Sequence, residues 1–161
     1  MIKIRKARLE DIPSMLEIFA VARQFMAKTG NPNQWADTYP SIELLTADIE
    51  SGDSYLCLLE EMIVATFVLR DGDDPTYDMI YEGAWQNDHP YATIHRIASN
   101  GEVKGIFSTV MSFALQHHHT IRIDTHRDNV VMQNILQKSV FVYCGIIHCW
   151  NGDERLAYQY Q

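Results

Sequence analysis

The sequence of 161 residues has few cysteines and no hydrophobic run long enough to cross a membrane. The two longest predominantly apolar stretches, residues 62–69 and 140–147, have eight residues each, whereas a membrane helix needs about 20. Three cysteines form an odd, sparse set, which suits a reducing compartment better than a disulfide framework. Charged residues at the start of the chain are followed by no apolar segment. We therefore expect no signal peptide and a cytoplasmic protein.

Low-complexity segments and Pro/Gly/Ser-rich linkers are also missing from the sequence. Hydrophobic residues make up 47% of the chain and charged residues 21%, which is ordinary for a globular protein with a sizeable core. The length corresponds to about one domain. The sequence therefore predicts a single domain over residues 1–161 and excludes disordered and collagen-like classes.

Basic residues are scarce in the middle of the chain. Residues 37–88 contain thirteen Asp and Glu but one basic residue, Arg70, which gives a net charge of −12. Nucleic-acid binding proteins have a basic stripe instead, so we expect neither a nucleic-acid nor a membrane partner. The acidic segment either attracts a cationic small molecule or forms a solvated surface.

The spacing of apolar residues alternates between the periods of strands and helices. It predicts strands at residues 2–7, 55–59, 62–70, 92–98, 121–125, 141–148 and 155–160. It predicts one helix that begins near Ile12 and stops at Gly30, and others at 42–51, 103–117 and 129–138. The order is β-α-α-β-β-β-α-β-α-β-β. An α/β fold with one mixed sheet, and with helices on both of its faces, accommodates this order.

The segment of residues 94–108 carries the clearest chemical signal. A buried strand leads into the polar turn Ser99-Asn100-Gly101, and the next helix has Gly105 in its first turn. A helix N-terminus of this kind presents free backbone N–H groups and a positive dipole end, which suit a phosphate. Gly105 by itself fits a helix packed tightly on a sheet equally well.

The stretch Glu102-Val103-Lys104-Gly105-Ile106-Phe107 resembles the pyrophosphate loop of the GNAT N-acetyltransferase superfamily, Gln/Arg-x-x-Gly-x-Gly/Ala. Asn129, Lys138 and Phe141 are similar to the family's Asn…Lys-x-Gly-Phe segment. The opening Ile4-Arg5-Lys6-Ala7, with the acidic turn after it, is also a common GNAT beginning. The resemblance extends over nearly the whole chain.

What the resemblance implies is an acetyl-CoA-dependent N-acetyltransferase that acts on a small amine or amino-acid-like acceptor and uses no metal. Coenzyme A would lie in a V-shaped opening of a GNAT-like mixed sheet. The main chain would bind the pantetheine arm and the pyrophosphate, and a side chain of the neighbouring helix would help to hold the pantetheine. The residues implied are Ile97, Ala98, Ser99, Val103, Lys104, Gly105, Ile106, Phe107, Ser108 and Asn129.

Val140 stands where the family's Lys-x-Gly-Phe segment has glycine, and three further residues depart from the family's pattern. Glu102 brings a carboxylate near phosphates, Phe107 adds bulk where the family has a small residue, and Leu136 stands where many members have a tyrosine acid. These departures leave an alternative, in which the chain is a coenzyme A-binding or dimerising module that has lost catalysis.

Acetyl transfer needs an uncharged amine and therefore a base. The candidate bases are His95 on the central strand and Glu82 in the segment before it, although His95 also fits a hydrogen-bonded core position. Trp35 and Trp85 are candidates for an aromatic wall of the acceptor pocket, with plain packing as the alternative.

Two further features point to other roles. Three consecutive histidines, residues 117–119, cannot easily converge on one ion when they are helical. We therefore expect that they bind no metal and that they lie at a helix C-terminus. The closing strand, residues 155–160, would pair with a second copy if it lies at an edge of the sheet. The sequence therefore predicts a homodimer.

Overall fold

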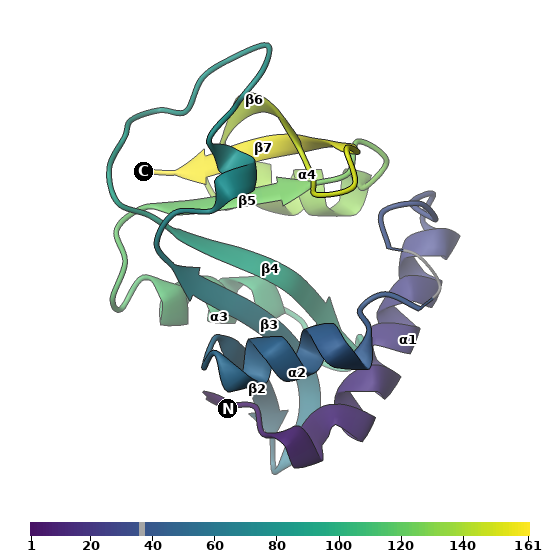
Figure 1. Cartoon of the computed structure of the whole chain (residues 1–161). Coiled ribbons are helices and arrows are strands. Elements are labelled where there is room, and N and C mark those ends of the chain that lie inside the picture. Colours follow the sequence, from purple (N-terminus) through teal and green to yellow (C-terminus); the bar gives the residue numbers. More distant parts are fainter. Residues whose placement is uncertain (36–37) are drawn as a thin grey trace.

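The computed structural model describes residues 1–35 and 38–161. Within these residues the chain forms seven strands, four α-helices and two short 3₁₀ turns (Figure 1). In chain order they are β1 (Ile2–Lys6), η1 (Leu9–Asp11), α1 (Ile12–Lys28), α2 (Ile42–Glu50), β2 (Ser54–Leu59), β3 (Met62–Asp71), η2 (Pro75–Tyr77), β4 (Ala92–Ser99), α3 (Ile106–Ala114), β5 (Ile121–Thr125), α4 (Val130–Lys138), β6 (Val142–His148) and β7 (Glu154–Tyr160). The predicted order of strands and helices is confirmed.

All seven strands belong to one mixed sheet in the order β1-β2-β3-β4-β5-β7-β6. Neighbouring strands are antiparallel except β4 and β5, which are parallel and joined through α3. One core cluster lies between the sheet and α3 and α4, and a second lies between the sheet and α1 and α2. Figure 1 shows α2 in front of the sheet and α3 behind it. The prediction of helices on both faces is confirmed.

The helix predicted at residues 103–117 is shorter than expected, because α3 spans Ile106–Ala114. Gly101 and Gly105 have positive φ angles of 81° and 76°, a conformation that a right-handed helix cannot contain. Gly105 is therefore the N-cap and does not lie in the first turn. At the other end the chain leaves the helix through turns after Leu115, so the three histidines lie beyond it.

The closing strand β7 is not an edge strand. It lies between β5 and β6 and pairs with both, because the chain passes outward to β6 before it returns. The reason for predicting a homodimer, an unpaired edge on this strand, was wrong, and β1 and β6 form the edges of the sheet.

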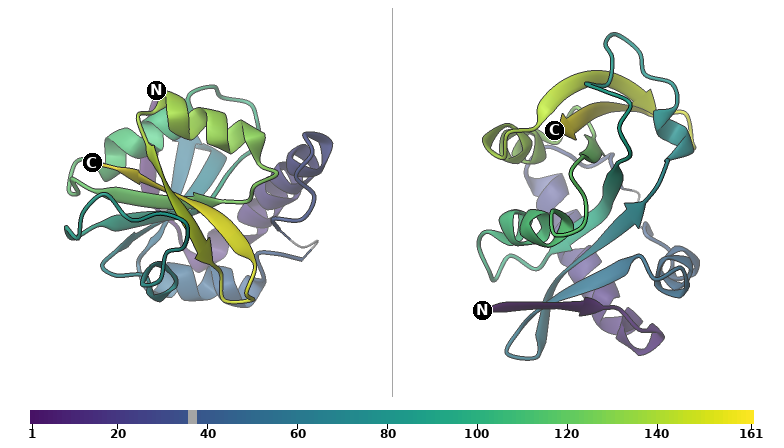
Figure 2. Two further views of the ribbon diagram at one scale, coloured as in Figure 1. Left: turned by 90° about the horizontal axis from the view of Figure 1, so that it is seen from above. Right: turned by 90° about the vertical axis from the view of Figure 1, so that its left-hand side faces the viewer.

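The sheet opens between β4 and β5 because β4 contains a bulge. Ala98 pairs with Thr66 and His95 with Val68, so Arg96 and Ile97 stand opposite the single residue Phe67. Arg96 adopts a φ of 48°. A bulge bends its strand and increases the local twist. Pairing between β4 and β5 in the described chain is confined to Ala92 with Ile121 and Thr93 with Arg122, and Figure 2 shows the two strands diverging beyond that point.

A buried ion pair holds the bulge to α2. Arg96 donates from Nε to Asp48 Oδ2 at 2.9 Å and from Nη2 to Oδ1 at 2.7 Å. The Asp48 side chain is 2% exposed and that of Arg96 11%. Arg70 reaches the same carboxylate at 3.2 Å, and Arg96 also bonds the Tyr39 hydroxyl. These contacts compensate for the positive φ at Arg96, which a side chain of this size adopts only when its surroundings impose it.

In the part of the chain that the structure covers, each helix is too short or too polar to cross a membrane.

We predict that Asp48→Asn lowers the free energy of unfolding by about 3 kcal/mol, because it leaves the Arg96 charge buried and uncompensated. Urea denaturation of wild type and variant measures this loss. The matched control is Asp53→Asn, which removes an ion pair with the more exposed Arg70 and should cost less than about 1 kcal/mol. Equal losses in the two variants would contradict a special role for Asp48.

Candidate active site

The opening between β4 and β5 exposes one edge of β4. The residues of β4 after Thr93 pair with β3 but, among the described residues, not with β5. The predicted residues Ile97, Ala98 and Ser99 are in this free part of the strand. Unpaired backbone groups need a hydrogen-bonding partner. An extended amide-containing chain such as pantetheine fits there as a substitute for the missing strand.

The N-terminus of α3 follows directly after the free end of β4. No side chain of the described residues caps it, so the N–H groups of Ile106, Phe107 and Ser108 lack intrahelical acceptors. The space that a β-carbon at Gly105 would enter is open for 4 Å. Together these features form a site for an anion, and they fit a pyrophosphate.

The turn between β4 and α3 is held by two side chains. Ser99 Oγ accepts the N–H of Gly101, and Asn100 Oδ1 accepts the N–H of Glu102, both at 3.0 Å. The hydrogen bond of Asn100 was not predicted from the sequence, although short polar side chains before glycine are typical of such turns. The side chains of Glu102 and Lys104 are exposed, and Val103 packs against the core. The structure thus brings together the predicted residues of β4 and of the loop.

Phe107 does not obstruct this loop, contrary to the sequence-based expectation. Its side chain is buried in the cluster behind the sheet, where its ring centre lies 6.1 Å from that of Phe141. At the second position of a helix the side chain points away from the N–H groups that face a ligand, so the bulk of Phe107 contributes to packing. Leu136 is fully buried in the same cluster.

Asn129 is the N-cap of α4. Its Oδ1 accepts the N–H of Met132 at 3.0 Å, and its Nδ2 donates to Gln34 Oε1 at 3.0 Å. The same Gln34 oxygen accepts from Asn31 and from the N–H of His126. Asn129 therefore connects α4 to the segment after α1, and a contact with pantetheine stays a prediction.

His95 lies on β4, two residues beyond its last pair with β5, and forms a dyad with Asp74. The distance from His95 Nε2 to Asp74 Oδ2 is 2.9 Å. Thr76 donates to Asp74 Oδ1 from both its N–H and its hydroxyl. Burial raises the pKa of Asp74, but the hydrogen bonds from His95 and Thr76 lower it more, to about 2. Because ionised Asp74 can only accept, it fixes the proton on Nε2 and leaves Nδ1 of neutral His95 as a base.

The other candidate base, Glu82, lies apart from this dyad. It is exposed and follows Tyr81, which bridges to Ile146 of β6. Within the described chain no hydrogen bond or ion pair joins Glu82 to His95. Asp74 was not predicted as a site residue because 21 residues separate it from His95 in the sequence. The local feature that could have indicated it is the Asp-Pro turn, in which Asp74 caps η2.

Tyr77 of η2 attaches this loop to β5. Its hydroxyl donates to Asp124 Oδ2 at 2.7 Å, and its ring centre lies 6.4 Å from that of His95. Burial, followed by the nearby carboxylate, raises the pKa of Tyr77 well above its ordinary value. Tyr77 therefore keeps its proton at neutral pH and stabilises the loop that carries Asp74.

Trp35 and Trp85 lie in different clusters and are both partly buried. Trp35 packs on Phe19 in the cluster under α1 and α2. Trp85 packs beside Tyr77, to whose carbonyl its Nε1 donates at 2.9 Å. The Arg122 guanidinium stacks 4.1 Å from the Trp85 ring. Both tryptophans therefore contribute to packing, and a role in an acceptor pocket stays a prediction.

The structure also shows where the three histidines and the acidic segment lie. Among the described residues no group of three or more His, Cys, Asp or Glu could hold a metal ion. Residues 117–119 line a shallow cavity with Asp71 and His89, and His118 Nδ1 is 3.7 Å from an Asp71 oxygen. In the acidic segment, Asp48, Asp53 and Asp74 are hydrogen-bonded within the fold, while Asp37 lies outside the described residues.

The chain thus combines a mixed sheet that is open between β4 and β5 with an uncapped helix N-terminus beside the opening. No family model matches the chain, and no curated protein matches it. Among solved structures, the chain is similar to a GNAT-family acetyltransferase from Streptococcus agalactiae with 35% identity, over 98% of this chain and 94% of that one, at a TM-score of 0.88. The chain therefore belongs to the GNAT family of acetyltransferases.

More distant structures share the fold. A putative acetyltransferase from Staphylococcus aureus is 21% identical over 98% of this chain and 97% of that one, with a TM-score of 0.70. A GNAT-family acetyltransferase from Listeria monocytogenes is 17% identical over 99% of this chain and 94% of that one, with a TM-score of 0.72.

We predict that Asp74→Asn removes the part of the free energy of unfolding that depends on ionisation of the Asp74 carboxyl. The carboxyl pKa falls from 3.8 to about 2 on folding, so its contribution is full above about pH 4 and is lost as the pH falls toward 2. The variant should be less stable by about 2 kcal/mol at pH 7. It should also lose less stability than wild type between pH 4 and 2.

Denaturation curves collected across this pH range measure both effects. Asp73→Asn, at the exposed neighbouring position, is the control and should follow wild type. A parallel pH profile of wild type and Asp74→Asn would show that the dyad is not formed.

Proposed function

We propose that this protein transfers the acetyl group of acetyl-CoA to the amine of a small acceptor. The observation that carries the proposal is the continuous path from the free edge of β4 to the uncapped N-terminus of α3. Membership of the GNAT family supports acetyl transfer in general. The dyad, whose His95 lies on the same strand, would supply a base.

The residues present fit coenzyme A. The main chain of Ile97 to Ser99 would pair with the amides of the pantetheine arm, and the N–H groups from Val103 to Ser108 would bind the pyrophosphate. The open space at Gly105 lets the phosphates approach the backbone. Acetyl-CoA would supply an activated thioester when it is bound.

The dyad would provide the deprotonation that the reaction requires. An amine with a pKa of about 10.4 is protonated at pH 7, and its deprotonation costs about 4–5 kcal/mol. His95 Nδ1 would accept this proton, directly or through water. The amine nitrogen would then form a bond to the acetyl carbon while the C–S bond breaks, and the second proton of the nitrogen would pass, directly or through water, to the leaving thiolate. N–H groups of the free β4 edge would stabilise the developing oxyanion.

The first test is whether acetyl-CoA stabilises the protein. A ligand that binds the native state at a hundredfold excess over Kd adds about 2.7 kcal/mol, so Tm should rise by roughly 5–10 °C. Thermal melts with and without millimolar acetyl-CoA measure the shift. The absence of any shift would contradict the proposal at its foundation.

The Gly105 site can be tested with two variants of equal shape. Asp and Asn both tolerate a positive φ, so Gly105→Asp and Gly105→Asn should fold with similar stability. The carboxylate of the Asp variant would repel the pyrophosphate and weaken acetyl-CoA binding by about tenfold relative to the Asn variant. Titration calorimetry measures both affinities, and equal affinities would mean that the pyrophosphate does not bind near Gly105.

A third test concerns His95. His95→Gln keeps a polar side chain but no base, so kcat should fall by about 100-fold or more while the affinity for acetyl-CoA is unchanged. Release of free thiol from acetyl-CoA with a mixed panel of amines measures kcat. Unchanged kcat would place His95 among structural residues, and coenzyme A binding without turnover of any amine by wild type would favour a module without catalysis.

A further inference from the structure

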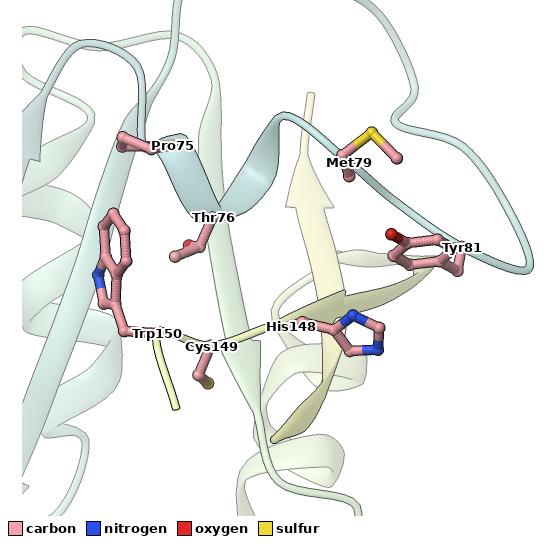
Figure 3. A pocket seen from close by; sticks show the side chains of 7 residues that line it. All are labelled: Pro75, Thr76, Met79, Tyr81, His148, Cys149 and Trp150. Carbon is pink, nitrogen blue, oxygen red and sulfur yellow. The ribbon is translucent and has the colours of Figure 1, made fainter. Parts of the chain in front are cut away.

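A cavity of about 290 Å³ lies next to the dyad and contains none of the site residues that the sequence predicted. In Figure 3, Thr76, Met79 and Tyr81 of η2 and the loop after it lie along one side. His148 and Trp150 lie along the other side, at the end of β6 and in the turn before β7. The volume is close to about 300 Å³, the lower end for small-ligand sites.

The walls of this cavity present apolar and aromatic surface to solvent. The exposed fractions are 82% for Trp150, 63% for Met79 and 41% for Tyr81. The Tyr81 ring lies 4.8 Å from the imidazole of His148, with an angle of 32° between their planes. Exposed apolar side chains gathered around one hollow are typical of ligand-binding sites, and flat rings favour a flat, apolar ligand group.

Thr76 connects the cavity to the candidate base. It lines the cavity, and its hydroxyl donates to Asp74 Oδ1 at 2.7 Å. The other oxygen of Asp74 lies 2.9 Å from His95 Nε2. The Thr76 side chain therefore lies between the cavity and the dyad, so an amine in the cavity would come nearest to the dyad at Thr76.

The lining of the cavity carries no fixed positive charge. It contains no Lys or Arg within the described chain, and Asp78 belongs to the segment along one wall. Asp74 is paired with His95, and Asp153 lies 4.0 Å from Arg155. Burial raises the pKa of the lining residue Cys149 to about 11 and outweighs the lowering effect of Arg155, so the thiol adds no charge at pH 7. The aromatic faces would attract an ammonium group by cation–π interaction.

We propose that this cavity is the acceptor subsite, and that it selects primary amines with an aromatic tail over polar and acidic amines. The proposal rests on the proposed acetyl transfer. The tail would lie between Tyr81 and Trp150, and the amine would point past Thr76 toward His95. The acetyl group is delivered along the free edge of β4, on which His95 lies.

The test compares 2-phenylethylamine, ethanolamine and glutamate as acceptors. We expect kcat/KM for phenylethylamine to exceed that for ethanolamine by about tenfold or more, the effect of one enclosed aromatic ring, and glutamate to be the poorest. Trp150→Ala should raise KM for phenylethylamine by about tenfold with kcat unchanged. Trp150→Phe, which keeps a flat ring, should restore most of the affinity.

The matched control is Tyr143→Ala. Tyr143 is also an exposed aromatic of β6 but lies outside the cavity, so this variant should keep the KM of wild type. A KM for phenylethylamine that is insensitive to Trp150→Ala, or equal kcat/KM for the three amines, would overturn the cavity as acceptor subsite.

A binding experiment separates this proposal from the proposed function. Titration calorimetry of phenylethylamine needs no turnover, and binding that Trp150→Ala abolishes and Tyr143→Ala preserves supports the cavity as the amine site. If phenylethylamine does not bind wild type with or without coenzyme A, the cavity proposal fails, even when other amines are acetylated. If it binds but acetyl-CoA neither stabilises the protein nor releases thiol, the proposed function fails by itself.

Discussion

The bulge at Arg96 is the constraint on which the rest of the site depends. Because two residues of β4 stand opposite one residue of β3, β4 turns away from β5 and leaves half of its edge without a partner strand. A positive φ at a non-glycine residue is unfavourable by itself, and the buried pair with Asp48 compensates for it. Since Asp48 belongs to α2, the helix packing in front of the sheet is coupled to the opening within it.

In the proposed reaction, the opening would also separate the two substrates. The N-terminus of α3 belongs to the layer behind the sheet, while the dyad and the cavity involve η2 and the turn after β6. His95 lies where the strands part, so an acetyl group that follows β4 would reach it from one side and an amine from the other. Each substrate would then bind to its own walls and meet the other at one base.

Much of the acidic charge of residues 37–88 has a structural use. Asp48 holds the bulge, Asp53 and Asp48 bind Arg70, and Asp74 orients His95. A count of charges along the chain left open whether this segment attracts a cation or forms a solvated surface, but several of these carboxylates bind fixed partners inside the fold.

Local patterns in the sequence determined the order of the strands and helices, the two helical layers and the turn that begins α3, because periodicity and glycine conformation act over short distances. Tertiary structure alone decided the rest. Insertion of β7 between β5 and β6 removed the expected edge. Packing buried Phe107 and partly buried Trp35 and Trp85 in two different clusters. The pairs of His95 with Asp74 and of Arg96 with Asp48 join residues 21 and 48 positions apart, and such partners are chosen by the meeting of separate elements, which no local pattern encodes.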